Sequence, residues 1–320
     1  MTIEDRLKQF LQYRIDRRTP DQTICSYRSE LGIFVRWLEE TTGIRRADLI
    51  TVEILHRYQA HLAEYRTIKG LPLKPSTVNG RVSSLKSFLD WLADRGYMNR
   101  RLSDHLFHIK EPDLLPTSVL DHGQIEALIE VIDLSTPVGL RDRAVYELLY
   151  SSGIRVGETV GIRLIDLDLN NAVLKVCGKG SKERMVPVGK TAIRYLTTYI
   201  RAGRPFLADK AVKPDDHLFL NTEGNALQAF TIRRRLHAYA AAAGLEKPGR
   251  DNPSEKRITP HTLRRSCTTE MVRADANLYH VKELLGHSTL RTLKHYAKLN
   301  INDIKKTHEQ CHPREKDDQE

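Results

Sequence analysis

The sequence predicts a mainly α-helical protein with two domains and one small antiparallel β-sheet. Four successive segments in the N-terminal third carry apolar side chains at the three- and four-residue steps of amphipathic helices. Farther along, two short apolar runs flank a glycine-rich turn, as in a β-hairpin, and helical spacing resumes beyond it. With 320 residues, 40% hydrophobic and 29% charged, the chain can form two hydrophobic cores and has an ordinary globular composition.

The N-terminal segments predict a four-helix module. Thr2 and Asp5 lie three residues apart, as in a capping box at a helix start, and Pro75 is suited to begin the fourth helix. The predicted helices span residues 3–17, 23–40, 51–66 and 75–96. Residues 98–118 lose this periodicity and contain Pro112 and Pro116, so we expect an extended linker there. We place the domain boundary at about residue 110, which gives domains 1–110 and 111–320.

The second domain is predicted to be helical around the hairpin. Its expected helices span residues 121–134, 139–152, 190–202, 226–243, 262–273 and 277–285, and the hairpin strands span 172–177 and 183–188. Gly286 is expected to end the last of these helices, and Ser288 or Thr289 can cap a further short helix that carries Tyr296.

The charge of the chain favours a polyanionic partner. Lys and Arg number 51 against 41 Asp and Glu, which gives a formal charge of +10 and a pI near 9.4, and both domains share the excess. Basic residues on the polar faces of the first domain could lie against a DNA backbone, although an ordinary charged surface would look the same. These residues are Arg14, Arg17, Arg18, Arg45, Arg46, Lys74, Arg81, Lys86, Arg100 and Arg101.

The sequence disfavours a secreted or membrane protein, and it also disfavours a fold held by zinc or disulfides. The N-terminus lacks the basic start and apolar core of a signal peptide, and no run approaches 18 apolar residues, so we expect a cytoplasmic protein. The four cysteines, Cys25, Cys177, Cys267 and Cys311, are far apart without a CxxC pair, which argues against a zinc knuckle or a disulfide framework.

Two arginines of the second domain have neighbours that suit phosphate binding. Arg155 follows the helix-ending Gly153, and Glu158, three residues on, could orient its guanidinium, although such a pair is also a common helix ion pair. His261 and Arg264 lie three apart and would share a helix face, which combines a proton-transfer group with a permanent cation. A surface pair at this spacing is the simpler alternative.

Three further residues complete a set suited to phosphoryl transfer. Lys179 lies at the hairpin tip, where it could reach a neighbouring groove or simply be solvated. Tyr296 follows His287 in a stretch rich in cations, so it is a candidate nucleophile, or else part of an apolar stripe. Phosphoryl transfer needs cations, a nucleophile and a proton donor, and this set offers all three. No Asp/Glu cluster suited to magnesium is apparent in the sequence.

The chain resembles the tyrosine recombinase (phage integrase) family, on its Xer-like side, over nearly its whole length. Each motif alone is weak, but five in the order and at the intervals of the family are specific. They are Gly153-Ile154-Arg155-Val156-Gly157-Glu158, Gly178-Lys179-Gly180-Ser181-Lys182-Glu183-Arg184, His261-Thr262-Leu263-Arg264, Leu284-Leu285-Gly286-His287-Ser288, and Tyr296.

The resemblance implies a site-specific DNA recombinase, or integrase. Tyr296 would attack a DNA phosphodiester and leave a 3′-phosphotyrosyl link and a free 5′-hydroxyl. Arg155 and Arg264 would hold the non-bridging oxygens, and His287 would donate another hydrogen bond to them. The covalent link conserves the bond energy, so neither ATP nor a metal is required, and no cofactor is implied.

The remaining roles also come from the resemblance. Lys179 would protonate the leaving 5′-oxygen, His261 would assist proton transfer at the tyrosine, and Glu158 would support the first arginine. Two positions depart from the family pattern, Arg265 where histidine is frequent and His295 beside the tyrosine. Neither departure removes a required group, so an active enzyme is expected.

The resemblance further implies a SAM-like core-binding domain and a catalytic domain of the DNA breaking-rejoining fold, which together clamp double-stranded DNA. Such proteins act as homo-tetramers on paired inverted-repeat sites. The tail, residues 299–320, could dock on a neighbouring protomer or form an intramolecular last helix. Two alternatives remain open, a type IB topoisomerase-like relaxation activity and a non-catalytic DNA-binding regulator on the same scaffold.

Overall fold

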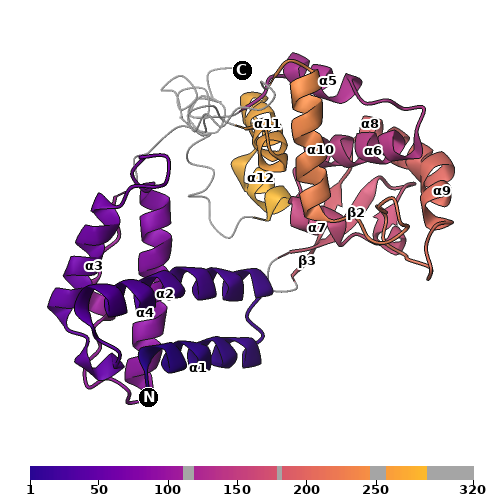
Figure 1. Cartoon of the computed structure of the whole chain (residues 1–320). Helices are drawn as coiled ribbons and strands as arrows, with labels where there is room; N and C mark the ends of the chain where they lie inside the picture. The colour runs from indigo at the N-terminus through magenta and orange to yellow at the C-terminus, as the bar shows by residue number, and fades with distance from the viewer. Residues whose placement is uncertain (111–118, 179–181, 246–256, 287–320) are drawn as a thin grey trace, which may run out of the picture. The chain divides into compact units, whose positions relative to one another are not determined.

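A computed structural model describes residues 1–110, 119–178, 182–245 and 257–286, and it divides the chain into two compact units, Met1–Pro112 and Asp113–Glu320 (Figure 1). Both units are mainly helical, and the second also holds a three-stranded antiparallel sheet. The predicted fold class is confirmed. Among the described residues, no helix is both long enough and apolar enough to cross a membrane.

Four helices build the first unit, as the sequence predicts. They are α1 (Ile3–Asp16), α2 (Asp21–Thr42), α3 (Val52–Glu64) and α4 (Pro75–Asp94), with short 3-10 helices at Ala47–Leu49 and Ser103–His105. The predicted capping box forms, because the Asp5 amide donates to the Thr2 hydroxyl and the Thr2 amide donates to the Asp5 carboxylate. Phe10 packs among Tyr27, Phe88 and Trp91, so an aromatic cluster joins α1, α2 and α4.

The segment expected as an extended linker belongs in its first part to this unit. Met98, Leu102 and Leu106 are buried in the core, at a four-residue spacing that the sequence analysis did not use. At Ile109, the backbone N–H donates to the Asn79 side chain over 2.8 Å, and the Asn79 amide donates to the Ile109 carbonyl over 2.9 Å. The chain is therefore held on the first unit up to this point. The other part of the expected linker, residues 111–118, lies outside the described residues.

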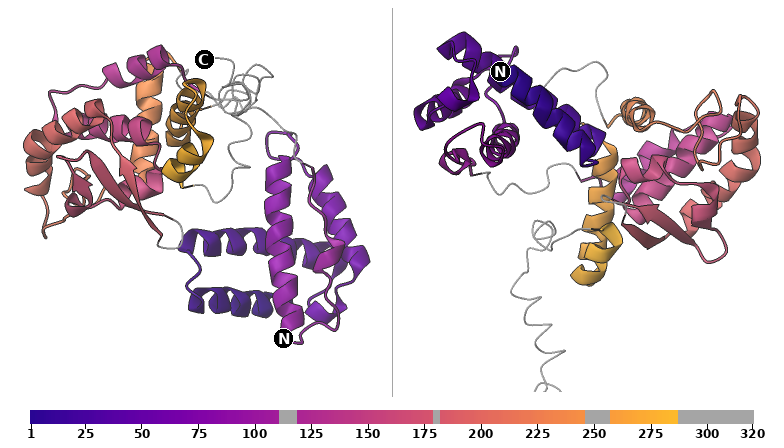
Figure 2. Two further views of the ribbon diagram at one scale, coloured as in Figure 1. Left: turned by 180° about the vertical axis from the view of Figure 1, so that it is seen from behind. Right: turned by 90° about the horizontal axis from the view of Figure 1, so that it is seen from below.

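The second unit is organised around α6. Its elements in chain order are α5 (His122–Glu130), α6 (Pro137–Ser152), α7 (Val156–Val160), a 3-10 turn (Leu164–Asp166), β1 (Leu167–Asp168), β2 (Val173–Cys177), β3 (Glu183–Pro187), α8 (Lys190–Thr198), a π-helical turn (Tyr199–Gly203), α9 (Arg204–Ala208), α10 (Ala229–Ala242), α11 (Pro260–Arg273) and α12 (Leu278–Leu285). Helix α6 is buried on most of its surface and packs against α8 and α11. Figure 2 shows the sheet along one edge of the helical layer of this unit.

The sheet has the strand order β1-β2-β3, with both pairs antiparallel. The predicted hairpin is confirmed, with Val176 opposite Arg184, while residues 179–181 at its tip lie outside the described residues. The two-residue strand β1 and the five-residue helix α7 were not predicted, because elements so short carry too few side chains to show a period.

The predicted helix at 190–202 continues farther than expected. Helix α8 passes into a π-helical turn and then into α9, which ends at Ala208. Gly203 in the π turn lies against the start of α6, where a Cβ atom would come within 3.2 Å of the Pro137 carbonyl oxygen. Glycine at 203 permits this close packing, and Pro205 lies in the first turn of α9, where a missing backbone N–H costs little.

Candidate active site

The C-terminal end of α6 lies next to the candidate site. Gly153 ends the helix in the left-handed conformation at φ 60°, and a Cβ atom there would lie 2.8 Å from the Leu285 side chain. Glycine thus serves both the turn and the close approach of α12. The Gly153 carbonyl accepts a hydrogen bond from Arg264, and the chain then leads to Arg155 at the start of α7.

Arg155 and Glu158 form the predicted ion pair. The Arg155 backbone N–H donates to one carboxylate oxygen of Glu158 over 2.8 Å, and its guanidinium donates to the other over 3.0 Å. Glu158 is buried, whereas 45% of the Arg155 side chain is exposed. Burial acts to raise the pKa of Glu158, but hydrogen bonds from Arg184 and Arg155 outweigh it and lower the pKa below its usual value. Glu158 is therefore an anion that fixes the exposed arginine.

Helix α11 supplies the second arginine. Thr259 caps the helix and Pro260 occupies its first turn, which places His261 and Arg264 one turn apart, as predicted. Arg264 is 3% exposed and donates to the carbonyls of Gly153 and Leu285, the latter over 2.6 Å. Burial, followed by the charge of Arg155, lowers its pKa to about 10, so the guanidinium remains charged at neutral pH.

Three arginines converge on the end of α12. Arg184 donates to the Leu284 carbonyl over 3.1 Å, Arg264 to the Leu285 carbonyl, and Arg155 to the Gly286 carbonyl over 3.2 Å. Carbonyls in the last turn of a helix have no partner within the helix and carry partial negative charge. The three guanidinium groups thus bring β3, α11 and the start of α7 to one point, which we call the α12 terminus (residues 284–286).

His261 is held in its neutral form. Its partial desolvation, followed by the charges of Arg265, Arg264 and Arg155, lowers its pKa from 6.5 to about 4. Arg265, one of the two positions at which the sequence departs from the family pattern, contributes the largest of these charge effects. A neutral imidazole offers one ring nitrogen as a hydrogen-bond acceptor, and the lowered pKa makes that nitrogen a weak base in the DNA-free protein.

Three candidate residues, Lys179, His287 and Tyr296, lie outside the described residues. The structure does describe the residues next to two of them, Gly178 before Lys179 and Gly286 before His287. The Gly178 N–H donates to the Lys182 carbonyl over 2.8 Å, and a Cβ atom on Gly178 would lie 3.6 Å from a Glu158 oxygen. The hairpin therefore leads to residue 179 from beside Glu158, and residue 287 directly follows the α12 terminus in the sequence.

Arg184 is a further residue of the site, for which the sequence alone predicted no role. In β3 the side chains of Arg184 and Val186 are the more buried ones, while Met185 between them is 62% exposed. An arginine on the inward face of a strand, with methionine outward, reverses the usual pattern and indicates a buried anionic partner. The period-two pattern of the hairpin could have revealed this residue.

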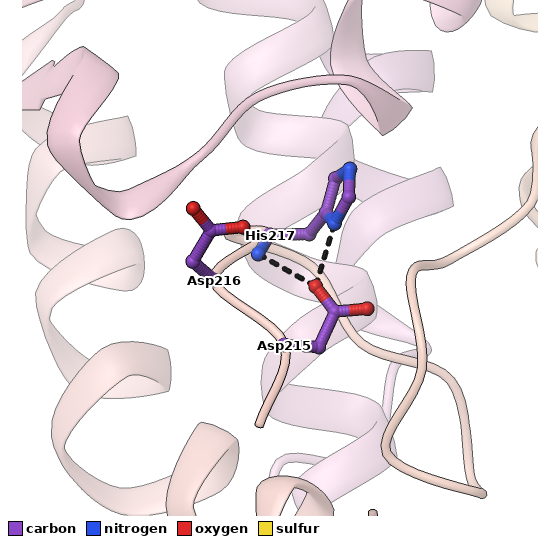
Figure 3. A group of neighbouring side chains, drawn as sticks. All are labelled: Asp215, Asp216 and His217. Carbon is purple, nitrogen blue, oxygen red and sulfur yellow. Dashed lines mark hydrogen bonds and ion pairs between the residues drawn. The ribbon is translucent and has the colours of Figure 1, made fainter. Parts of the chain in front are cut away.

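A second polar group lies in the loop before α10, where Asp215, Asp216 and His217 have potential ligand atoms within 4.8 Å of one another (Figure 3). Asp215 accepts bonds from the backbone and ring nitrogens of His217 over 2.9 and 2.6 Å and from the Ala226 N–H, while Asp216 pairs with Arg163. These bonds order the loop, and we assign no chemistry to the group.

The described part of the second unit brings three guanidinium groups and a histidine into one region, a set of side chains suited to an anionic ligand. Residues 118–303 match the phage integrase family, and residues 7–96 match the phage integrase N-terminal SAM-like domain. The chain belongs to the phage integrase family.

Its relatives cover most of its length. It is 35% identical over 292 residues to tyrosine recombinase XerC 2 of Ralstonia nicotianae, covering 91% of this chain and 80% of the relative. It is 32% identical over 319 residues to tyrosine recombinase XerD of Listeria monocytogenes, covering 98% and 100%.

Solved structures share the fold. The XerH recombinase bound to its difH substrate superposes with a TM-score of 0.69 at 19% identity, covering 94% of this chain and 82% of that one. A lambda integrase dimer bound to a core site gives a TM-score of 0.69 at 17% identity, covering 92% and 95%. At these identities the likeness shows the fold alone.

We predict that the His261 imidazole of the DNA-free protein titrates near pH 4, as the pKa of about 4 requires. The unfolded chain would take up this proton near pH 6.5, so His261 destabilises the fold as pH falls from about 6.5 toward 4 and has no such effect above that range. NMR titration measures the midpoint. Arg265→Ala should raise it, while Arg273→Ala, at the far end of α11, should leave it unchanged. A midpoint near 6.5 in the unmodified protein would contradict the electrostatic account.

Proposed function

We propose that this protein is a site-specific DNA recombinase that cuts and rejoins DNA through a 3′-phosphotyrosyl intermediate. Membership in a family whose relatives are named tyrosine recombinases supports the reaction class. The observation that carries the proposal for this chain is the meeting of Arg155 and Arg264 at the α12 terminus. Two guanidinium groups held from different helices suit the two non-bridging oxygens of one phosphate.

In the proposed reaction the phenol oxygen of Tyr296 attacks the scissile phosphorus. A tyrosine O–P bond forms, the bond from phosphorus to the 5′-oxygen breaks, and the 3′ side of the cut strand stays on the protein. Negative charge builds on the non-bridging oxygens, where Arg155 and Arg264 stabilise it and His287 adds a hydrogen bond. The reverse attack by a 5′-hydroxyl, from the same or another strand, restores the phosphodiester.

Two protons must move in this step. The neutral His261 accepts the phenol proton, and Lys179 gives a proton to the leaving 5′-oxygen. The lowered pKa leaves the imidazole of His261 unprotonated at neutral pH, and the negative charge of a bound phosphodiester would raise that pKa toward the range of an effective base. Glu158 reacts with neither group and holds Arg155 in place.

The assembly is part of the proposal. Residues 1–110 would act as a core-binding domain and residues 111–320 as the catalytic domain, with double-stranded DNA between them. The match of residues 7–96 to the N-terminal SAM-like domain and of residues 118–303 to the phage integrase family supports this division, and the net charge of +10 favours a nucleic acid. We propose a homo-tetramer on paired inverted-repeat sites, since joining two cut duplexes requires four active protomers. Cleavage of one duplex without exchange would instead favour a topoisomerase-like relaxation activity.

We predict that Tyr296→Phe abolishes covalent protein–DNA adducts, because a phenyl ring has no oxygen to attack phosphorus. The substrate can be obtained by incubating the protein with random duplexes and recovering those that become covalently attached. Adducts are then measured by denaturing electrophoresis on a nicked form of the selected site. The matched control is Tyr279→Phe, which changes an exposed tyrosine of α12 and should cleave normally. Persistent adducts with Tyr296→Phe would refute the nucleophile assignment.

Arg155→Lys should slow cleavage by about 100- to 1,000-fold and leave DNA affinity within a factor of a few, because an ammonium keeps the charge but loses the two-pronged geometry. Single-turnover cleavage and a gel-shift titration measure the two quantities separately. Arg163→Lys, an exposed arginine paired with Asp216, serves as the control. Near-normal cleavage by Arg155→Lys would remove Arg155 from the phosphate site.

A further inference from the structure

We propose that Arg184 is a positioning residue for DNA cleavage, which fixes the phosphate-binding Arg155 through Glu158 and ties both to the α12 terminus. The inference rests on the proposed function and adds a residue to its machinery. Arg184 does not touch the phosphate in this proposal. Its influence passes through the buried carboxylate, whose orientation decides where the exposed guanidinium of Arg155 points.

The first evidence is the saturation of Glu158. One carboxylate oxygen accepts from the guanidinium groups of Arg155 and Arg184, both over 3.0 Å. The other accepts from the Arg155 backbone N–H over 2.8 Å and from the second nitrogen of Arg184 over 3.0 Å. A carboxylate offers about four lone-pair sites, so all are filled and the group cannot rotate without losing a bond. Arg184 supplies half of these bonds in a planar, bidentate fork.

The second evidence is the contact of the same guanidinium with α12. The third nitrogen of Arg184 donates to the Leu284 carbonyl over 3.1 Å, so one rigid group joins Glu158 to the α12 terminus. Gly286 makes this possible, since a Cβ atom there would lie 3.1 Å from the guanidinium of Arg184. The arginine thus sets the distance between the Arg155–Glu158 pair and the helix end from which the chain enters His287.

The Arg184–Glu158 pair is buried, while Arg155 is more exposed. The side chain of Arg184 is 16% exposed and that of Glu158 is 5% exposed, whereas that of Arg155 is 45% exposed. Without Arg184, Glu158 could turn to bind Arg155 with both oxygens and swing its guanidinium away from the position that the phosphate needs. A misplacement of about 1 Å at a reacting centre can slow a reaction by about 100-fold.

The test compares Arg184→Gln with the unmodified protein on two nicked DNA sites that differ only at the scissile position. One carries the natural phosphodiester and the other an uncharged methylphosphonate. On the phosphodiester, cleavage by the variant should be about 10- to 100-fold slower, with unchanged DNA affinity. On the methylphosphonate, the cleavage rates of the variant and the unmodified protein should differ by only a few-fold. The reason is that a neutral phosphorus centre gains less from a well-placed Arg155 guanidinium. An equal defect on both substrates would mean a general structural role and would overturn the inference.

Two further variants keep the test decisive. Arg184→Lys preserves the charge beside Glu158 but cannot form three directed bonds, so it should fold normally and cleave at an intermediate rate. In Glu158→Gln/Arg184→Gln, cleavage should be no slower than in the slower single variant, because both act through one unit. Multiplying defects would contradict the pathway through Glu158. Arg163→Gln serves as the control and should retain the unmodified rate.

The outcomes separate the two proposals. If the unmodified protein forms no adduct with phosphodiester DNA, the proposed function fails. If it forms the adduct and Arg184→Gln cleaves equally well, the function stands and only the role of Arg184 is refuted.

Discussion

The site depends on three guanidinium groups that share three consecutive carbonyls at the end of one helix. Such cations would repel one another strongly if they were unpaired. Glu158 offsets one charge, and the helix terminus contributes the equivalent of roughly half a negative charge, so an excess of about one and a half positive charges remains. Desolvation lowers the pKa of His261 first, and the charges of Arg265, Arg264 and Arg155 add to that effect. The excess positive charge also suits the site to an anionic ligand such as the proposed phosphodiester.

The same arrangement explains why elements far apart in the chain must meet. The end of α6, the β2–β3 hairpin, α11 and α12 each contribute a group, and none of them holds the site alone. Two glycines in left-handed conformations, Gly153 and Gly286, permit the close approach of α12. A side chain at either position would meet Leu285 or Arg184, so the packing of these elements and the geometry of the proposed phosphate site depend on the same two glycines.

The sequence predicted the parts of this protein that leave a periodic or a motif signal. The four-helix module, the hairpin and the pairing of Arg155 with Glu158 were accessible because each is set by near neighbours in the chain. The positions of Met98, Leu102 and Leu106 were not used, since three apolar residues in a proline-flanked stretch compete with the signature of a linker. The elements β1 and α7 were too short to detect.

The role of Arg184 could be inferred only from the three-dimensional structure. Its motif is visible in the sequence, but its partners are Glu158, 26 residues away, and Leu284, 100 residues away, and no local rule connects them. The same holds for the contact of Arg264 with Gly153. Motif order thus predicts which residues take part, and the three-dimensional structure is required to show which of the described ones hold one another in place.

The most direct measurement is a crystal structure of the Tyr296→Phe variant bound to its uncut recombination site. Our account predicts that the non-bridging oxygens of the scissile phosphate lie within about 3 Å of the guanidinium nitrogens of both Arg155 and Arg264. It would be contradicted by a scissile phosphate bound elsewhere, with Arg155 and Arg264 still donating only to protein groups such as Glu158 and the carbonyls of Gly153, Leu285 and Gly286.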